Sequence, residues 1–201
     1  MIKKLILILI GSIPGILLII NNNIKAAIIY FISYLILVIL LLILTKKKNR
    51  VLFISSTGGH LEELLQLKPL IDKYDYYIVT EKTDTNKNLK DKYKVGYLVY
   101  GTRKTPIRYA FIMIINGFKS LYIYFKIKPK VIVTTGTHTA VIMCYIGKIF
   151  GSKIIFIETF ANRETKTLAG RLVYPISDLF VVQWKEMLKI YPKSVYFGGV
   201  Y

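Results

Sequence analysis

Hydrophobic residues fill the first 44 positions of the chain almost without interruption, whereas polar residues recur every few positions after residue 50. Residues 24–44 form an apolar run with a single charged residue near its start. A helix of that length crosses the roughly 30 Å hydrocarbon layer of a bilayer. Lysines at 46–48 and Arg50 follow immediately, so the positive-inside rule places this end of the predicted transmembrane helix on the cytoplasmic side.

A second apolar segment, at residues 5–20, precedes this helix and is interrupted by glycine and proline at residues 11–15. We favour a helical hairpin with both ends on the cytoplasmic side. A shallow or re-entrant segment, kinked where Pro14 lacks a backbone donor, is an alternative. A cleaved signal peptide is less favoured, because no small-residue cleavage site precedes Asn21. We therefore expect a cell-membrane anchor over residues 1–48 and a globular domain over residues 49–201 on the cytoplasmic side.

After residue 50, short apolar runs alternate with helical stretches, and this alternation predicts an α/β domain with a parallel sheet. The expected strands are residues 51–55, 76–80, 97–100, 131–134, 153–157, 178–183 and 195–197. The expected helices are residues 61–70, 107–126, 139–150, 166–173 and 184–190.

The predicted helix 107–126 is apolar nearly all round, with polar interruptions at Arg108, Asn116 and Lys119. It is either a buried crossover helix or one whose outer face contacts the membrane surface. We favour partial membrane contact, in which Arg103, Lys104 and Arg108 meet lipid headgroups.

The charge balance narrows the class of partner. The chain carries 29 Lys and Arg residues against 11 Asp and Glu residues, all eleven acids lying beyond residue 50, and its formal net charge is +18. Such a chain suits an anionic membrane, a phosphate-bearing substrate or nucleic acid. Because a membrane segment is present, we favour lipid and phosphate and expect no nucleic-acid partner.

Three loops at the ends of predicted strands carry the candidate site. Ligands bind outside the carboxyl ends of the strands in open parallel sheets. Glycines let the backbone approach a ligand, and the N–H groups of a helix N-terminus favour an anion. The candidate anion-binding residues are Ser56, Thr57, Gly58 and Gly59 after the first strand, and Thr135, Gly136, Thr137 and His138 after the fourth.

His60 completes the first loop, and Glu158 follows the fifth strand. His60 can donate, accept or titrate near neutral pH. Plainer roles also remain open: Gly-Gly-His as a simple strand-to-helix connection, Gly136 at a helix N-cap, and Glu158 as a cap or as a partner of Arg163. Together on one sheet edge, the three loops favour a binding cleft.

Several site classes are absent from the sequence. It contains no Walker loop, no dinucleotide fingerprint, no metal-ligand spacing and no nucleophile elbow, so we expect neither a metal nor a cofactor. The single cysteine, Cys144, cannot form an internal disulfide and lies in an apolar run, which indicates a buried thiol.

Four stretches carry a resemblance to a known family: residues 55–61 (SSTGGHL), 135–137 (TGT), 156–163 (FIETFANR) and 178–184 (DLFVVQW). In these stretches the chain resembles the bacterial PssD/CpsF-type exopolysaccharide biosynthesis proteins. These are similar to the membrane-anchor subunit of the eukaryotic split N-acetylglucosaminyltransferase (the Alg-fourteen type). The resemblance covers residues 51–201, and the Gly-Gly-His loop is shared with the wider MurG-like superfamily.

The resemblance implies a Rossmann-like domain, the N-terminal half of a GT-B glycosyltransferase of the MurG kind. In the family this half anchors the enzyme, helps to bind a lipid-diphosphate acceptor and recruits a small donor-binding subunit. That partner would be PssE/CpsG-like or Alg-thirteen-like. The sequence ends at Tyr201 with no second Rossmann domain, which agrees with a split enzyme, so we expect the chain to be inactive alone.

The predicted function is therefore that of a membrane-anchoring, acceptor-binding subunit of a two-component glycosyltransferase in exopolysaccharide or capsule biosynthesis. The loop at residues 56–60 would hold the acceptor diphosphate. His60 would orient that phosphate or act as general base on the acceptor hydroxyl, and Glu158 would be the competing base or would fix its loop. The alternatives are a stand-alone membrane glycosyltransferase and a non-enzymatic membrane scaffold.

Overall fold

The computed structural model describes residues 13–17, 19–20, 23–43, 47–102 and 104–200. The chain divides into two compact units, Met1–Lys46 and Lys47–Tyr201.

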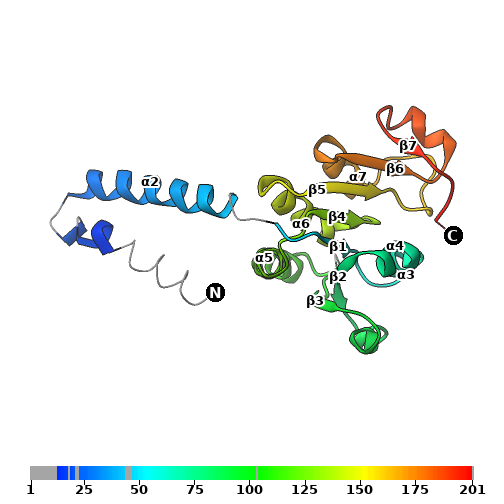
Figure 1. Cartoon of the computed structure of the whole chain (residues 1–201), viewed down its shortest axis with the longest axis horizontal. Helices are drawn as coiled ribbons and strands as arrows, with labels where there is room; N and C mark the ends of the chain where they lie inside the picture. The colour runs from blue at the N-terminus through cyan, green and yellow to red at the C-terminus, as the bar shows by residue number, and fades with distance from the viewer. Residues whose placement is uncertain (1–12, 18, 21–22, 44–46, 103, 201) are drawn as a thin grey trace. The chain divides into compact units, whose positions relative to one another are not determined.

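The first unit is helical in its described part. Helix α2 spans Ile24–Ile43, one residue shorter than the predicted apolar run. Residues 13–17 and 19–20 are also helical, and a Cβ atom at Gly15 would overlap the rings of Tyr30 and Phe31. The earlier segment therefore folds back on α2, as a hairpin requires (Figure 1). Much of the predicted first segment (residues 5–12 and 18), Asn21 and Lys46 lie outside the described residues.

The second unit contains a seven-stranded parallel sheet in the order β3-β2-β1-β4-β5-β6-β7, which confirms the predicted α/β class (Figure 1). The strands are β1 (Arg50–Ile54), β2 (Asp75–Lys82), β3 (Val95–Val99), β4 (Val131–Thr134), β5 (Lys153–Ile157), β6 (Leu179–Val182) and β7 (Val195–Tyr196).

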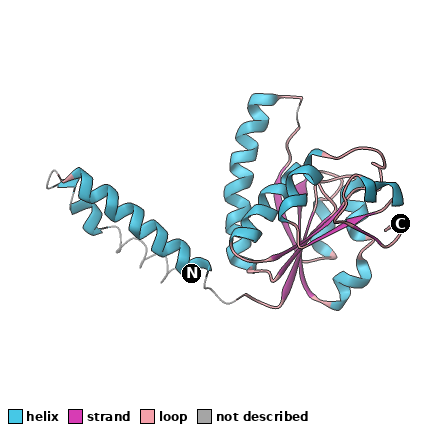
Figure 2. Ribbon diagram, turned by 90° about the horizontal axis from the view of Figure 1, so that it is seen from above, coloured by secondary structure: helices cyan, strands magenta, loops and turns pink. Residues whose placement is uncertain are grey.

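Helices cover both faces of this sheet (Figure 2). They are α3 (Gly59–Leu65), α4 (Lys68–Lys73), α5 (Pro106–Ile127), α6 (His138–Ile149) and α7 (Leu168–Val173), with 3₁₀ turns at Lys87–Asp91, Tyr174–Ile176 and Lys185–Lys189. The prediction of one helix over residues 61–70 is wrong, because the chain breaks into α3 and α4 there. Pro69 has no N–H to donate to Leu65, so it can only stand in the first turn of a new helix. The segment predicted as helix 184–190 forms a 3₁₀ turn instead.

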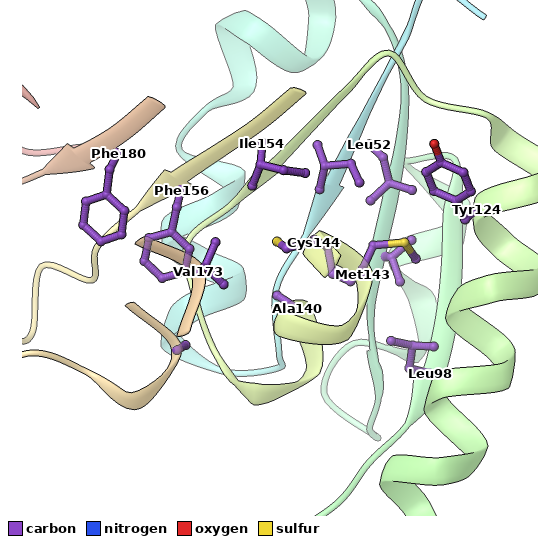
Figure 3. Close-up of a cluster of buried hydrophobic side chains, with 14 of the residues drawn as sticks. Leu52, Leu98, Tyr124, Ala140, Met143, Cys144, Ile154, Phe156, Val173 and Phe180 are labelled. Carbon is purple, nitrogen blue, oxygen red and sulfur yellow. The ribbon is translucent and has the colours of Figure 1, made fainter. Parts of the chain in front are cut away.

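Alternating strand residues build two separate cores. Leu52 and Ile54 of β1 face the helices α5, α6 and α7, whereas Phe53 faces α3 and α4. This follows from the two-residue period of a strand, and both faces are apolar because helices cover both. The larger core includes Cys144, whose buried position confirms the prediction (Figure 3). Burial raises the pKa of the Cys144 thiol to about 12.

Helix α5 packs on the sheet mainly through apolar side chains, and Asn116 adds a polar contact to this interface. The Asn116 side chain donates to the Val99 carbonyl and accepts from the Val99 N–H, both at 2.8 Å. The buried face of the helix comprises Ile112, Asn116, Ser120, Ile123, Tyr124 and Ile127. Its opposite face carries an apolar stripe of exposed residues: Ile107, Phe111, Ile114, Ile115, Phe118 and Tyr122. The helix is thus a crossover helix with a second, uncovered apolar face.

Among the described residues, α5 is the one helix long and apolar enough to cross a membrane, and a third of its apolar window is buried in the protein. The apolar stretch Ile24–Val38 of α2 is shorter than this. The hydrogen-bonded packing of Asn116 on β3 explains why α5 serves as a sheet-covering element in this unit.

Candidate functional site

The candidate site lies where the strand order of the sheet reverses, between β1 and β4. Strands β1 and β4 are neighbours, and the chain adds strands outward from them to opposite sides. In open parallel sheets this arrangement opens a crevice at the carboxyl ends of the two central strands. Strand β5 is the next neighbour of β4. The three loops identified in the sequence therefore meet at one edge of the sheet.

Hydrogen bonds to the neighbouring strand β2 hold the loop after β1 in place. Ser55 and Ser56 are buried; the Ser55 N–H donates to Val79, and the Thr80 hydroxyl donates to the Ser56 carbonyl at 3.2 Å. Gly58 has a φ of 73°, which favours glycine, and its carbonyl accepts the first hydrogen bonds of α3. The backbone thus turns sharply and presents Gly59 and His60 at the start of that helix.

Two hydrogen bonds join this loop to the loop after β4. The Thr135 hydroxyl donates to the His60 carbonyl at 2.8 Å. His60 Nδ1 lies 3.1 Å from the Thr135 carbonyl oxygen. A carbonyl can only accept, so Nδ1 carries the proton in this bond, and Nε2 of the neutral ring is left as an acceptor.

The loop after β4 has an unusual backbone. Gly136 and Thr137 have φ angles of 101° and 87°. A β-branched residue at positive φ is strained, and such residues persist where the surrounding structure imposes them. The turn leads directly into the twelve-residue helix α6, whose first residue is His138. Among the described residues, the buried Thr137 Oγ1 and His138 Nε2 have no hydrogen-bond partner.

These loops line a pocket of about 250 Å³, whose surface is about half polar and half apolar, called the loop pocket below. Its lining residues are His60, Thr135, Gly136, Thr137, His138, Glu158, Thr159, Thr167, Leu168 and Ala169. Both histidines of the chain border it. A second pocket, of about 450 Å³, adjoins it through the shared residues His60 and Thr159.

Not all of the predicted anion-binding residues border the loop pocket. Ser56, Thr57, Gly58 and Gly59 are not among its lining residues, and Gly59 lines the second pocket instead. The Thr57 hydroxyl instead lies 3.1 Å from the Thr83 hydroxyl and accepts from Asn86 Nδ2. These contacts hold the β1 and β2 loops together, a role that sequence spacing does not reveal.

Glu158 lines the loop pocket, and both of its carboxyl oxygens accept hydrogen bonds. Its carboxyl group accepts from the Thr167 and Tyr191 hydroxyls at 2.8 Å each and from the Thr159 N–H at 3.2 Å. Burial raises the pKa of Glu158 despite these donors. The alternative that Glu158 pairs with Arg163 is wrong, because the Arg163 guanidinium stacks 5.1 Å from the Trp184 ring centre.

Two buried glutamates near the histidines were missed by the sequence reasoning. Glu63 and Glu81 are each only 1% exposed. Glu63 lies 3.8 Å from His60 Nδ1, and Glu81 lies 3.5 Å from His138 Nε2. The signal for Glu63 was its position three residues after His60 in the same helix. Glu81 lies near the carboxyl end of strand β2. Burying a carboxylate there is costly unless it has a partner, and this was the signal for Glu81.

Glu81 belongs to a small polar cluster beside the loop pocket. The Thr139 hydroxyl donates to Glu81 Oε1 at 2.6 Å, and the Tyr109 ring packs edge-on against His138 at 5.3 Å between centroids. Helix α5 therefore supplies one side of the His138 environment. Lys104 and Arg108, near the N-terminus of α5, line an open apolar groove with Phe111 and Ile115; Arg103 lies outside the described residues.

The fold and the position of this pocket define a class of protein, the Rossmann-like domains of the GT-B type. The solved structure of MurG from Acinetobacter baumannii matches with a TM-score of 0.54 and 14% identity over 69% of this chain and 43% of that chain. UDP-N-acetylglucosamine 2-epimerase from Rickettsia bellii matches with a TM-score of 0.57 and 13% identity over 75% and 45% of the two chains. The chain thus spans less than half of each of these structures.

The chain belongs to the family "Oligosaccharide biosynthesis protein Alg14 like", whose model matches residues 50–200. One relative is the mouse protein named UDP-N-acetylglucosamine transferase subunit ALG14. It is 26% identical over 179 residues, which covers 75% of this chain and 82% of the mouse protein.

Proposed function

We propose that this protein is the acceptor-binding, membrane-anchoring subunit of a two-component glycosyltransferase. It belongs to a family whose mouse member is named as a subunit of a UDP-N-acetylglucosamine transferase. The observation that carries the proposal is the loop pocket itself, built at the switch point of the sheet from small residues, two histidines and the N-terminus of α6. Such a pocket suits an anion with an adjoining hydroxyl group.

In this proposal the loop pocket holds the diphosphate of a lipid-linked acceptor. Within the described part of the chain, Thr137 Oγ1 makes no hydrogen bond and His138 Nε2 has only the Glu81 carboxyl group, 3.5 Å away, so both atoms keep hydrogen-bonding capacity for an oxygen-rich ligand. Helix α6 is long enough to contribute its dipole, whereas α3 has only seven residues. The diphosphate site therefore centres on residues 135–138 more than on the Gly-Gly-His loop.

His60 is the general base of the proposed reaction. Its Nε2 takes the proton of the acceptor hydroxyl while the hydroxyl oxygen bonds to the sugar and the nucleotide diphosphate leaves. The Nδ1 contact with Thr135 holds the ring in the tautomer that this step needs. Glu158, whose oxygens are occupied by Thr167 and Tyr191, fixes the loop after β5.

The donor-binding half resides on a separate partner subunit in this proposal. The mouse relative's name, UDP-N-acetylglucosamine transferase subunit, supports this division between two chains. A separate chain with a nucleotide-sugar site would complete the cleft above the loop pocket. We further propose that the reaction belongs to exopolysaccharide or capsule biosynthesis, with a PssE/CpsG-like partner. The resemblance of residues 55–61 and 156–163 to exopolysaccharide proteins supports this assignment.

The protein acts at the cytoplasmic face of the cell membrane in this proposal. Helix α2 and the segment before it form the anchor, and its described apolar side chains are largely exposed. The apolar stripe on α5, with Lys104 and Arg108 at one end, touches the lipid surface and brings the acceptor to the loop pocket.

The test is sugar transfer in proteoliposomes containing the full chain and the small subunit that co-purifies with it from membranes. The donor is radiolabelled UDP-N-acetylglucosamine and the acceptor is a prenyl-diphosphate-linked sugar. We expect transfer only when both subunits are present, and we expect His60→Gln to lower kcat/KM by about 100-fold without loss of partner binding.

Tyr74→Ala is the matched control, because this exposed aromatic residue precedes β2 at the opposite edge of the sheet. Robust transfer by this chain alone would contradict the two-component scheme and favour a stand-alone enzyme. Unchanged transfer in both His60→Gln and Glu158→Gln would mean that the protein serves only as a membrane scaffold.

A further inference from the structure

The second pocket, beside the loop pocket, combines an aromatic ring with a buried carboxyl group. Gly59, His60, Glu63, Thr159, Phe160 and Ala161 line its volume of about 450 Å³. Phe160 is 36% exposed, whereas Glu63 is 1% exposed. The lining is mainly apolar apart from His60 and Glu63.

The Trp184 side chain holds the Phe160 ring in place. Its centroid lies 4.5 Å from that of Trp184, and Trp184 Nε1 donates to the Phe160 carbonyl at 2.8 Å. Arg163 in turn packs on the Trp184 ring. An aromatic residue fixed by its own backbone and by a second ring provides a rigid platform, so little conformational entropy is lost when a ligand packs on it.

Hydrogen bonds fix the position of the Glu63 side chain. Its Oε1 atom accepts from the Phe160 N–H at 2.9 Å and from Gln183 Nε2. Gln183 also donates to the Glu158 carbonyl at 2.9 Å, so α3, β6 and the loop after β5 are tied together. The Oε2 atom lies 3.8 Å from His60 Nδ1, beyond hydrogen-bond distance. Oε2 therefore keeps acceptor capacity at the pocket wall.

We propose that this pocket binds a pyranose ring of the acceptor saccharide, with the apolar face of the sugar on Phe160 and a ring hydroxyl donating to Glu63 Oε2. This inference rests on the proposed function, because it needs a sugar attached to the diphosphate in the loop pocket. His60 and Thr159 border both pockets, so one ligand can extend from one into the other. A sugar hydroxyl then comes next to the base, His60.

The chemistry of the wall favours a sugar over the hydrocarbon chain of the lipid. A prenyl group packed against Glu63 would leave a buried carboxyl oxygen without a donor, which is costly. A pyranose has C–H groups on its faces and hydroxyl groups on its edge. Its C–H face therefore packs on the Phe160 ring while one of its hydroxyl groups donates to the Glu63 carboxyl group.

The experiment compares two kinds of water-soluble probe on the full chain in nanodiscs. One is farnesyl diphosphate, and the other is farnesyl diphosphate carrying N-acetylglucosamine, glucose or galactose. We expect at least one sugar to tighten binding of the unmodified chain by about ten-fold relative to farnesyl diphosphate. Calorimetry measures the ratio of the two dissociation constants.

The variants separate the sugar contribution from the diphosphate contribution. Phe160→Ala should abolish the ratio and leave the affinity for farnesyl diphosphate unchanged, whereas Phe160→Tyr should keep the ratio. Glu63→Gln retains an oxygen for the Phe160 N–H and should reduce the ratio by about three- to ten-fold. Tyr74→Ala, at the far edge of the sheet, should leave both affinities unchanged.

Each contrary outcome has a distinct meaning. Tight farnesyl diphosphate binding without any sugar increment overturns the sugar site and leaves the diphosphate site standing. Equal weakening of both probes by Phe160→Ala assigns the pocket to the prenyl chain and likewise overturns it. Failure of both probes to bind removes the proposed function together with this inference.

Discussion

His60 and Thr135 are joined by two hydrogen bonds although 75 residues separate them in the chain. One bond runs from the Thr135 hydroxyl to the His60 carbonyl, and the other joins His60 Nδ1 to the Thr135 carbonyl. The pair locks the loops after β1 and β4 to each other across the switch point. It also decides which nitrogen of the imidazole faces the loop pocket.

This pair predicts the tautomer of His60. In the neutral ring the proton should reside on Nδ1, because the Thr135 carbonyl can only accept. Nitrogen-15 NMR of histidine-labelled full chain, at a pH where the ring is neutral, measures this directly. The chain has only two histidines, and His138→Gln assigns the signals. A proton found on Nε2 of His60 would contradict the proposed role as base.

Glu158 should make stability fall as the pH rises. Burial raises its pKa in the folded protein above the usual range of a glutamate. Between the unfolded and folded pKa values, the folded state therefore binds more protons, so unfolding becomes easier with increasing pH. Glu158→Gln removes this dependence, and its stability relative to the unmodified chain should improve from about pH 4 to about pH 7.

Urea denaturation of the detergent-solubilised full chain at both pH values measures this difference. Glu164→Gln is the matched control, since Glu164 is exposed and should show no such trend. A relative stability of Glu158→Gln that worsens with rising pH would mean that the buried carboxylate is net favourable.

Asp178 should act in the opposite direction. Burial opposes its charge, but hydrogen bonds from the Ile154 N–H, Lys153 and Lys148 outweigh burial and lower its pKa to about 2. A depressed folded-state pKa stabilises the protein above the unfolded pKa, and this stability is lost as the pH falls through the folded value. Asp178→Asn should therefore cost on the order of 2 kcal/mol at neutral pH.

The same denaturation series checks the Asp178 prediction. The cost should shrink between about pH 4 and about pH 2, where the unmodified side chain also becomes neutral. Asp91→Asn, at an exposed aspartate, should cost little at any pH. A pH-independent cost for Asp178→Asn would assign the effect to shape instead of charge.

Gly170 should not tolerate a side chain. A Cβ atom there would collide with the Glu158 carboxyl, the Tyr191 hydroxyl and the Thr167 hydroxyl. Gly170→Ala should therefore destabilise the protein by about 1–3 kcal/mol. Gly117→Ala in α5 is the control, because a Cβ there meets nothing within 4 Å and should stabilise the helix by up to about 1 kcal/mol. Thermal unfolding of the two variants compares them.

The apolar stripe on α5 should meet lipid. Phe118 is 71% exposed on this stripe, and the only native cysteine, Cys144, is buried with a raised pKa and should not be labelled. An environment-sensitive dye on Phe118→Cys should therefore shift to the blue in nanodiscs with anionic lipid, compared with the solubilised chain. The same dye on Tyr74→Cys should not shift, and an equal shift at both positions would contradict specific contact by α5.

The sheet was predictable because its strands are local and strongly patterned. Each expected strand lies within a few residues of the observed one, since both faces of a covered parallel strand are apolar. The break between α3 and α4 was missed although Pro69 marks it, because the apolar spacing continues across the proline. The uncovered face of α5 was expected because the helix is apolar nearly all round, but the hydrogen bonds of Asn116 with Val99 were not.

By itself the sequence determined that an apolar N-terminal segment precedes a parallel α/β domain, and that three loops with small residues and two histidines end its strands. Hydrophobic periods and glycines encode these features locally. Only the tertiary structure decided that Thr57 turns away from the loop pocket and that Glu63 and Glu81 stand beside the histidines. It also decided that Phe160 and Glu63 face one pocket. Contacts between residues about a hundred positions apart, such as Phe160 with Glu63, depend on strand order, and strand order is not written in any local pattern.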